Sequence, residues 1–89
     1  MKIVCSPLYE SQIKVVLEEM AHENLKSAID FKLYLDTVLM NAHTKFKKYK
    51  QSIYFEKETV KDVEFEGYTI PIFYDEVLDK YIILGVVKK

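Results

Sequence analysis

The chain has 89 residues, of which 49% are hydrophobic, 13% aromatic and 30% charged. This length supports one hydrophobic core, so we expect a single domain over residues 1–89, and the apolar content excludes intrinsic disorder. Thirteen lysines and fourteen acidic residues give a net charge of −1, which argues against a protein that coats nucleic acid through its overall charge. None of the cations is arginine, so no side chain can form a bidentate contact with phosphate or carboxylate.

The cysteine content and the first residues bear on the cellular compartment. Cys5 is the only cysteine, so no disulfide can form within the chain and a thiolate metal cluster is excluded. Residues 1–4 lead directly into polar sequence, without the apolar segment of a signal peptide. No segment reaches the ~18 apolar residues of a membrane span. We therefore expect a cytoplasmic protein without a membrane partner.

A short strand and a helix are predicted at the start of the chain. Residues 3–5 are typical of a strand, and Ser6 and Pro7 suit the cap and the first turn of a helix. Apolar residues then recur at spacings of three and four, which predicts a helix from Pro7 to about Ala21. These apolar residues are Tyr9, Ile13, Val16, Leu17 and Met20.

A second helix is predicted after the polar residues 22–24, with Asn24 as its cap. This helix has one apolar side, formed by Ala28, Phe31, Leu35, Val38, Leu39 and Ala42. It should fray near His43 and Thr44, where the sequence becomes rich in lysine. So short a break between two helices predicts an antiparallel helical hairpin.

Strands are predicted from Lys61 onward, where the apolar period changes from helical to alternating. Residues 66–67 offer a tight reversal into a strand over residues 68–74, and residues 76–79 offer a second reversal into a strand over residues 81–87. The predicted fold is therefore α+β: one strand, an antiparallel helical hairpin and a three-stranded antiparallel meander that packs against it. We expect the first strand beside the last strand or the third.

Few residues are candidates for catalysis or metal binding. His22 and His43 belong to no metal or catalytic motif, and a zinc site needs three or four ligands at recognisable spacing, so we expect surface histidines, no metal and no cofactor. Cys5 has no histidine near it in the sequence, and we expect a buried structural thiol. The carboxylates of residues 75–79 are expected to form a solvated turn.

Residues 45–55 form the most distinctive segment because they combine four lysines with aromatic residues. Lysines could contact phosphates or carboxylates, and Tyr49 or Tyr54 could stack on a base or fill a pocket of a partner. The alternative is a solvated loop whose other apolar residues lie in the core, namely Phe46, Ile53 and Phe55. The candidate target-binding residues are Lys45, Lys47, Lys48, Tyr49, Lys50 and Tyr54, together with Lys88 and Lys89 at the end of the chain.

The near-neutral net charge conceals a segregation of charge along the chain. Residues 37–61 contain six lysines and two glutamates, whereas residues 62–79 contain six carboxylates and no cation. This pattern favours docking onto one charged partner over coating of nucleic acid.

Four parts of the chain follow the pattern of a known family: residues 2–7, the helical hairpin, residues 49–55, and the reversal at Gly67 and Tyr68 with the last strand. In these features the chain resembles the RelE/ParE toxin superfamily over almost its whole length. The resemblance implies the toxin of a type II toxin–antitoxin system, which inhibits growth or stabilises a plasmid and is neutralised by a cognate antitoxin. We expect the antitoxin to bind the outer groove of the hairpin and a sheet edge.

Two activities occur in this superfamily. RelE-like toxins are ribosome-dependent mRNA endonucleases that use Lys and Arg on a concave sheet face, often with a C-terminal Tyr, whereas ParE-like toxins inhibit DNA gyrase. The Gly-Tyr-Arg pattern of the RelE-like strand is here Gly67-Tyr68-Thr69, so the cation is missing at Thr69, and no tyrosine follows Lys88 and Lys89. Loss of such a cation removes stabilisation of charge in the transition state.

We therefore predict a non-catalytic, ParE-like inhibitor of DNA gyrase. One alternative is a RelE-like nuclease with Lys47, Lys48 and Lys88 as catalytic residues. A second alternative is a degenerate member that binds antitoxin without being toxic. The expected partners are the antitoxin and either gyrase or the ribosome, with no sequence-specific binding to nucleic acid.

Overall fold

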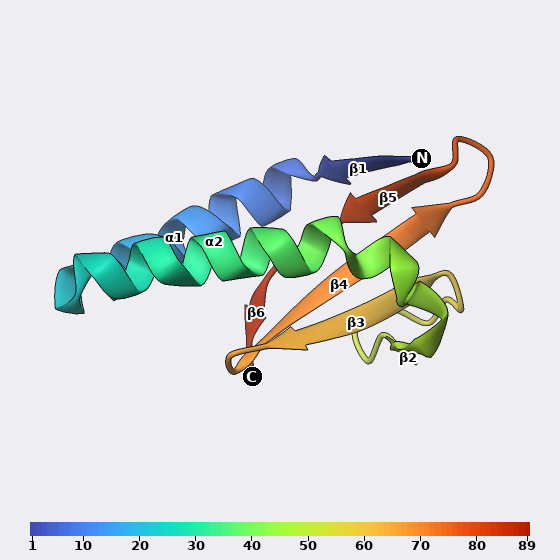
Figure 1. The fold of residues 1–89 in the computed structure, drawn as a ribbon. Coiled ribbons are helices and arrows are strands. Elements are labelled where there is room, and N and C mark those ends of the chain that lie inside the picture. Colours follow the sequence, from blue (N-terminus) through green and yellow to red (C-terminus); the bar gives the residue numbers. More distant parts are fainter.

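The computed structural model describes the whole chain, and its elements confirm the predicted α+β order. Strand β1 (Lys2–Cys5) leads into helices α1 (Pro7–Glu23) and α2 (Leu25–Met40), which are followed by two 3₁₀ turns, η1 (Ala42–Thr44) and η2 (Phe46–Lys48). The remaining strands are β2 (Lys50–Gln51), β3 (Val60–Phe65), β4 (Tyr68–Asp75), β5 (Lys80–Ile83) and β6 (Val87–Lys88). Figure 1 shows α2 crossing one face of the sheet, with the closed end of the hairpin extending past it. Neither helix is long and apolar enough to span a membrane.

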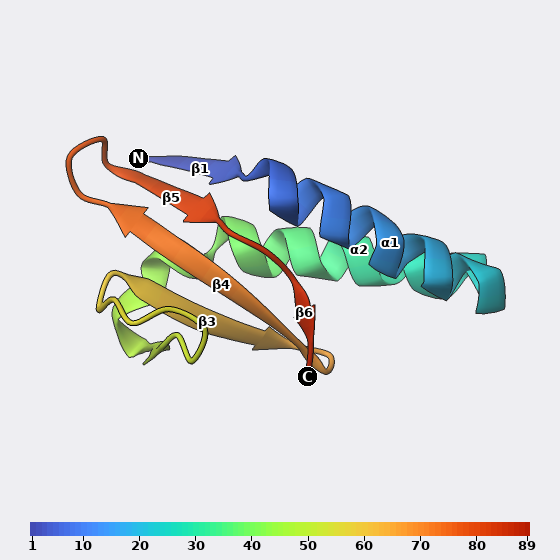
Figure 2. The same ribbon diagram turned by 180° about the vertical axis from the view of Figure 1, so that it is seen from behind.

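The sheet is mixed and has the order β1-β5-β4-β3-β2, with β6 paired to β4 (Figure 2). Strands β3, β4 and β5 form the predicted antiparallel meander, and β1 pairs in parallel with β5, which confirms its expected place beside the last strand. The two-residue strand β2 was not predicted.

The predicted strand over residues 81–87 is divided into two. Pairing of β5 with β4 ends at Ile83, and β6 resumes the pairing opposite Thr69. Between these points Pro71 faces the same edge: its carbonyl accepts a hydrogen bond from the N–H of Leu84 at 2.9 Å, but its ring nitrogen has no hydrogen to donate. The strand therefore leaves the ladder where β4 lacks a donor.

Local capping defines the start of both helices, as predicted. The Ser6 hydroxyl accepts a hydrogen bond from the N–H of Tyr9 at 3.1 Å, which caps α1. Asn24 serves both helices: its N–H donates to the carbonyl of Met20 at 2.9 Å, and its side-chain oxygen accepts from the N–H of Ser27 at 3.1 Å. One residue therefore ends α1 and begins α2.

Both helices end within a few residues of the predicted positions. Helix α1 continues to Glu23, and α2 ends at Met40, before residues 43–44. At the end of α2 the carbonyl of Thr37 accepts hydrogen bonds from both the backbone N–H of Asn41 at 3.2 Å and the Asn41 side chain at 2.8 Å. Ala42, which was expected on the apolar side of the helix, lies in η1 and is buried in the core.

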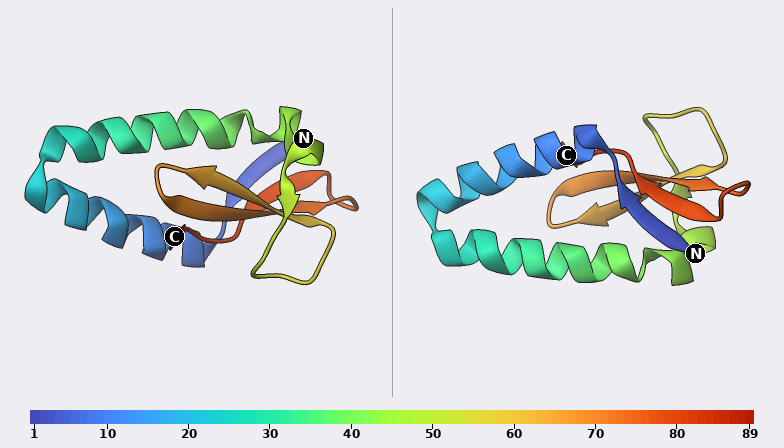
Figure 3. Two further views of the ribbon diagram at one scale, coloured as in Figure 1. Left: turned by 90° about the horizontal axis from the view of Figure 1, so that it is seen from below. Right: turned by 90° about the horizontal axis from the view of Figure 1, so that it is seen from above.

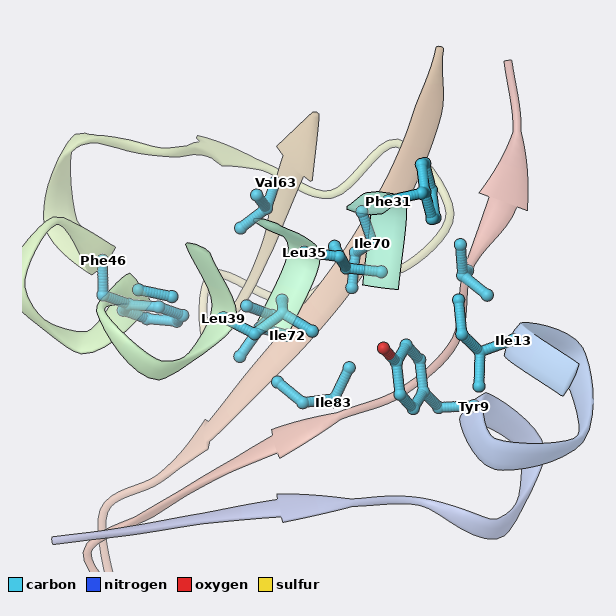
Figure 4. Packing of buried hydrophobic residues seen from close by; sticks show 12 residues of the cluster. Tyr9, Ile13, Phe31, Leu35, Leu39, Phe46, Val63, Ile70, Ile72 and Ile83 are labelled. Atoms are coloured by element: carbon cyan, nitrogen blue, oxygen red, sulfur yellow. The ribbon is translucent and has the colours of Figure 1, made fainter. Parts of the chain in front are cut away.

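The core lies between α2 and the sheet, and the start of α1 closes it on one side (Figure 4). Helix α2 contributes buried residues at spacings of three and four, namely Ala28, Phe31, Leu35 and Leu39. The sheet contributes Val63, Ile70, Ile72 and Ile83. Only Tyr9 and Ile13 of α1 are buried, because the rest of this helix extends beyond the sheet with the closed end of the hairpin.

Gln12 joins α1 to the segment between β5 and β6. Its side-chain oxygen accepts a hydrogen bond from the N–H of Val86 at 2.9 Å, and a Cβ atom at Gly85 would lie 2.7 Å from that oxygen. Gly85→Ala should displace Gln12 and lower the free energy of unfolding by about 1–2 kcal/mol, because the buried N–H of Val86 loses its partner. Urea denaturation measures the change. In a Gln12→Ala background the same substitution should cost almost nothing, and an equal loss in both backgrounds would contradict this explanation.

Candidate functional site

The predicted binding segment begins at η2, which is anchored by Phe46. The buried Phe46 ring has its centroid 5.2 Å from that of Tyr81 and 6.0 Å from that of Tyr74. Aromatic pairs at these separations are favourable, so they fix the 3₁₀ turn against the ends of β4 and β5. The lysines around this anchor are all exposed, and they are Lys45, Lys47 and Lys48.

The next two predicted residues differ in accessibility. Tyr49 is half-buried and packs against the core, which covers part of its ring. Lys50 is exposed in β2 and lies opposite Asp62 of β3. This places opposite charges side by side on neighbouring strands, an arrangement that stabilises strand pairing modestly.

The alternative that placed Ile53 and Phe55 in the core is wrong. Ile53, Tyr54 and Phe55 are 83%, 46% and 40% exposed, and we call these three residues the apolar finger. The buried residues of this loop are the ones at its two ends, Ser52 and Val60. Because the ends are buried, the loop between them turns outward and carries its apolar side chains with it.

The last two lysines project to opposite faces of the sheet. Lys88 pairs with Tyr68, whose ring contacts Phe31 of α2, so Lys88 lies on the helix side. Lys89 is the next residue and lies on the other side, where its ammonium forms an ion pair with Glu64. The alternation of side chains along a strand explains this separation. Lys89 is therefore held at the sheet instead of forming a free tail.

Two of the candidate lysines, Lys50 and Lys88, lie far apart on the sheet. Lys50 lies opposite Asp62, and Asp62 lies opposite Pro71, three residues along β4 from Tyr68 and its partner Lys88. With strands about 4.8 Å apart and a rise of about 3.3 Å per residue, the Cα atoms of Lys50 and Lys88 are roughly 17 Å apart. Side chains alternate between the two faces of a sheet, and Pro71 and Tyr68 are an odd number of residues apart. Lys50, which follows the side of Pro71, and Lys88, which follows the side of Tyr68, therefore project from opposite faces.

The position of the missing arginine is closed to solvent. Thr69 is 2% exposed, in the middle of a three-strand pairing with Glu64 on one side and Val87 on the other. A phosphate could not reach its hydroxyl without opening the sheet. The sequence showed the absence of a cation at this position, and the structure adds that the position is buried.

The other candidate groups form no catalytic arrangement. His22 is exposed near the end of α1, and the Nδ1 atom of the half-buried His43 lies 3.1 Å from the carbonyl of Met40. No three His, Cys, Asp or Glu residues are close enough together to hold a metal ion. The prediction of a buried Cys5 is wrong, because β1 is an edge strand and leaves the residue exposed. Partial burial of the sulfur, together with the charge of Glu10, raises the pKa of the Cys5 thiol, which keeps it protonated at neutral pH.

The acidic turn between β4 and β5 is ordered by its own carboxylates. The Asp75 side chain accepts hydrogen bonds from the N–H groups of Val77 and Leu78 at 3.0 and 3.2 Å. The Tyr74 hydroxyl donates to Asp79 at 3.0 Å, and the Met1 ammonium lies 3.3 Å from the same carboxylate. These four carboxylate contacts tie the turn to β4 and to the start of β1. The turn is exposed, as predicted.

The contacts of Asp79 make stability depend on pH. The hydrogen bond from Tyr74, followed by the Met1 ammonium, lowers the pKa of Asp79 below its ordinary value of 3.8. A carboxyl with a lowered pKa stabilises the fold above its unfolded-state pKa, and the contribution is lost as the pH falls through the folded-state pKa. Between about pH 5 and about pH 2 the wild-type chain should therefore lose more unfolding free energy than Asp79→Asn. Urea denaturation at both pH values checks this, and identical losses would contradict it.

An apolar groove lies between α1 and α2 of the hairpin, where antitoxin binding was expected, and the residues that line it were not predicted. It has a volume of about 440 Å³, and its apolar lining consists of Leu17, Ala21, Leu25, Ala28, Ile29 and Leu33. Leu25, Ile29 and Leu33 are exposed and recur every four residues, so they form a second apolar stripe on α2 beside the one in the core. This spacing is the signal in the sequence that could have located the groove.

The open edge of β1 is a second surface, on which backbone N–H and carbonyl groups have no strand to pair with. The N–H groups of Lys2 and Ser6 donate to the carbonyls of residues 79 and 83 at 3.3 and 3.0 Å. Since alternate residues of a strand face the same neighbour, the backbone groups of Ile3 and Cys5 point to the open edge. A cavity of about 600 Å³ lies beside this edge, and its lining includes Asp36, Leu39 and Met40 of α2.

Comparison with known proteins identifies the fold. No protein-family model and no curated protein matches the sequence. Among solved structures, the chain is similar to one described as "Chromosomal ParDE TA system from P. aeruginosa", with a TM-score of 0.78 and 9% sequence identity. The match covers 99% of this chain and 95% of the other chain. The chain therefore has the RelE/ParE toxin fold.

Proposed function

We propose that this chain is the toxin of a type II toxin–antitoxin pair and that it acts by binding DNA gyrase without catalysing a reaction. The observation that carries the proposal is the whole-chain likeness to a structure of a ParDE toxin–antitoxin system. At 9% identity this likeness concerns the fold, so the activity is tested by the experiments below.

The lack of a cation at the buried position of Thr69 supports a binding function over a nuclease function. A nuclease of the RelE type needs cations that meet around one phosphate. Lys50 and Lys88 project from opposite faces of the sheet, Lys89 is paired with Glu64, and Thr69 is buried. Scattered cations can still contact a large charged partner over a wide surface, which suits an inhibitor.

Two surfaces suit an antitoxin segment. The groove between α1 and α2 offers apolar side chains over about two helical turns, enough to receive the apolar face of a helix. The open edge of β1 offers the backbone groups of Ile3 and Cys5, to which an extended segment could add as a strand beside Leu39 and Met40. A single antitoxin tail with a helix and a strand could occupy both surfaces.

Production of the chain alone in bacterial cells tests the proposal. Growth should stop with a DNA-damage response, and simultaneous production of the product of the neighbouring reading frame should restore growth. Unaffected growth together with tight binding of that product would favour the degenerate, non-toxic alternative. Cleavage of mRNA on translating ribosomes, abolished by Lys47→Ala, Lys48→Ala or Lys88→Ala, would instead favour the nuclease.

A further inference from the structure

We infer that the apolar finger, formed by Ile53, Tyr54 and Phe55, is the anchor through which this chain binds its target, and that the site it enters is an apolar cavity in an acidic protein surface. The inference rests on the proposed function and deepens it. It specifies which residues enter the target and which chemistry receives them.

The start of the finger is fixed by hydrogen bonds. The N–H of Ser52 donates to the carbonyl of Val60 at 2.9 Å, and the N–H of Tyr54 donates to the Ser52 hydroxyl at 3.1 Å. The N–H of Ile53 donates to the Asp62 carboxylate at 3.0 Å. Three consecutive backbone donors are therefore satisfied by groups at the base of the loop, which sets the direction in which the finger leaves the sheet.

The return of the loop is fixed in the same way. The N–H of Val60 donates to the carbonyl of Lys57 at 3.1 Å, and the N–H of Tyr74 in β4 donates to the carbonyl of Thr59 at 3.0 Å. A loop held at both ends loses less conformational entropy on binding than a free one. The exposed apolar side chains of the loop are therefore already positioned before the partner binds. This is favourable for residues that are to dominate the binding energy of a protein interface.

The charges around the finger specify the electrostatics of its partner. Residues 45–58 contain five lysines and two glutamates, in a chain whose net charge is −1. All five lysines are exposed. Such a segment is attracted to a negative surface and repelled by a positive one. Figure 3 shows the loop at the end of the molecule opposite to the turn between the helices, so the finger is separate from the hairpin groove.

The residues of the finger favour a protein over a nucleic acid as its binding partner. Ile53 is the most exposed residue of the finger, and an aliphatic side chain cannot stack on a base as an aromatic ring does. An apolar cavity with acidic groups at its rim would bury the apolar side chains of the finger and pair with the surrounding lysines.

Photocrosslinking in cells tests the inference without relying on toxicity. The photoreactive residue benzoylphenylalanine replaces Tyr54 in the full chain and, as the control, Tyr34 of α2, which is more exposed at 66% against 46%. We expect one protease-sensitive adduct from position 54 that is absent from position 34. An adduct removed by ribonuclease, or no adduct specific to position 54, would overturn the inference.

Binding measurements with the crosslinked protein, identified and purified, provide the second test. Ile53→Ser with Phe55→Ser should weaken binding about 30-fold or more. The matched control is Val77→Ser with Leu78→Ser, which removes two more exposed apolar side chains (91% and 61%, against 83% and 40%) from the acidic turn and should leave binding unchanged. Equal affinities of the finger variant and the wild type would overturn the inference. Failure of the wild-type chain to arrest growth would contradict the proposed function alone, because neither test reads growth.

Discussion

Leu35→Ala should lower the free energy of unfolding by about 3–4 kcal/mol. Leu35 is 0% exposed at the centre of α2 and packs toward Ile70 and Ile72 of the sheet (Figure 4). Truncation leaves a cavity that a hydrogen-bonded strand cannot move to fill. A domain of this size is stable by about 5–15 kcal/mol, so the loss is a large part of the total. The melting temperature should fall by roughly 15–20 °C. Thermal and urea denaturation measure the loss.

Leu33→Ala is the matched control for this prediction. Leu33 lies on the same helix and is 60% exposed, so the same truncation should change the free energy of unfolding by less than about 0.5 kcal/mol. Comparable losses at the two positions would contradict the packing of α2 against the sheet.

Ile29→Glu should weaken binding of the antitoxin by about 100-fold or more while the chain stays folded and toxic. Ile29 lines the groove between α1 and α2 and is 52% exposed in the free chain, so the substitution is tolerated there. In the proposed complex an apolar helix would bury the new carboxylate without a partner, which is strongly unfavourable. Isothermal titration with the product of the neighbouring reading frame measures the affinity.

Val15→Glu is the control for the groove. Val15 lies on α1, is 53% exposed and does not line the groove, so the same change of charge should leave the affinity within about threefold of the wild type. Unchanged binding by Ile29→Glu would show that the antitoxin uses another surface, the open edge of β1 first among them.

Local signals explain why much of the fold was predictable. The caps at Ser6 and Asn24 act within four residues, so the helix starts could be deduced from neighbouring residues. The alternation from Lys61 onward follows from burial of one face of each strand. Strand β2 was missed because it depends on a residue far away in the sequence, Asp62. The division of the last strand likewise depends on another strand, through Pro71.

The candidate site was less predictable because apolar character alone does not determine burial. Ile53 and Phe55 have the apolar character of core residues, but hydrogen bonds from Ile53 to Asp62 and from Tyr54 to Ser52 turn this segment outward. Cys5 has the neighbours of a buried strand residue, but β1 is at the edge of the sheet. These outcomes depend on tertiary neighbours that no sequence window contains.

The lysines illustrate a related limit. The sequence showed where cations occur along the chain, but the direction of each side chain depends on the register of the sheet. Pairing of Lys88 with Tyr68 directs it to the helix side, whereas Lys50 lies with Asp62 on the other side. Two of the candidate target-binding lysines are thus separated by the pleat.

The central proposal is that this chain inhibits DNA gyrase by binding it, without catalysis. The most direct measurement is DNA supercoiling by purified gyrase in the presence of the purified chain. Supercoiling should be blocked at saturating chain and restored when the antitoxin is added. Supercoiling that continues unaffected at saturating chain would contradict the claim.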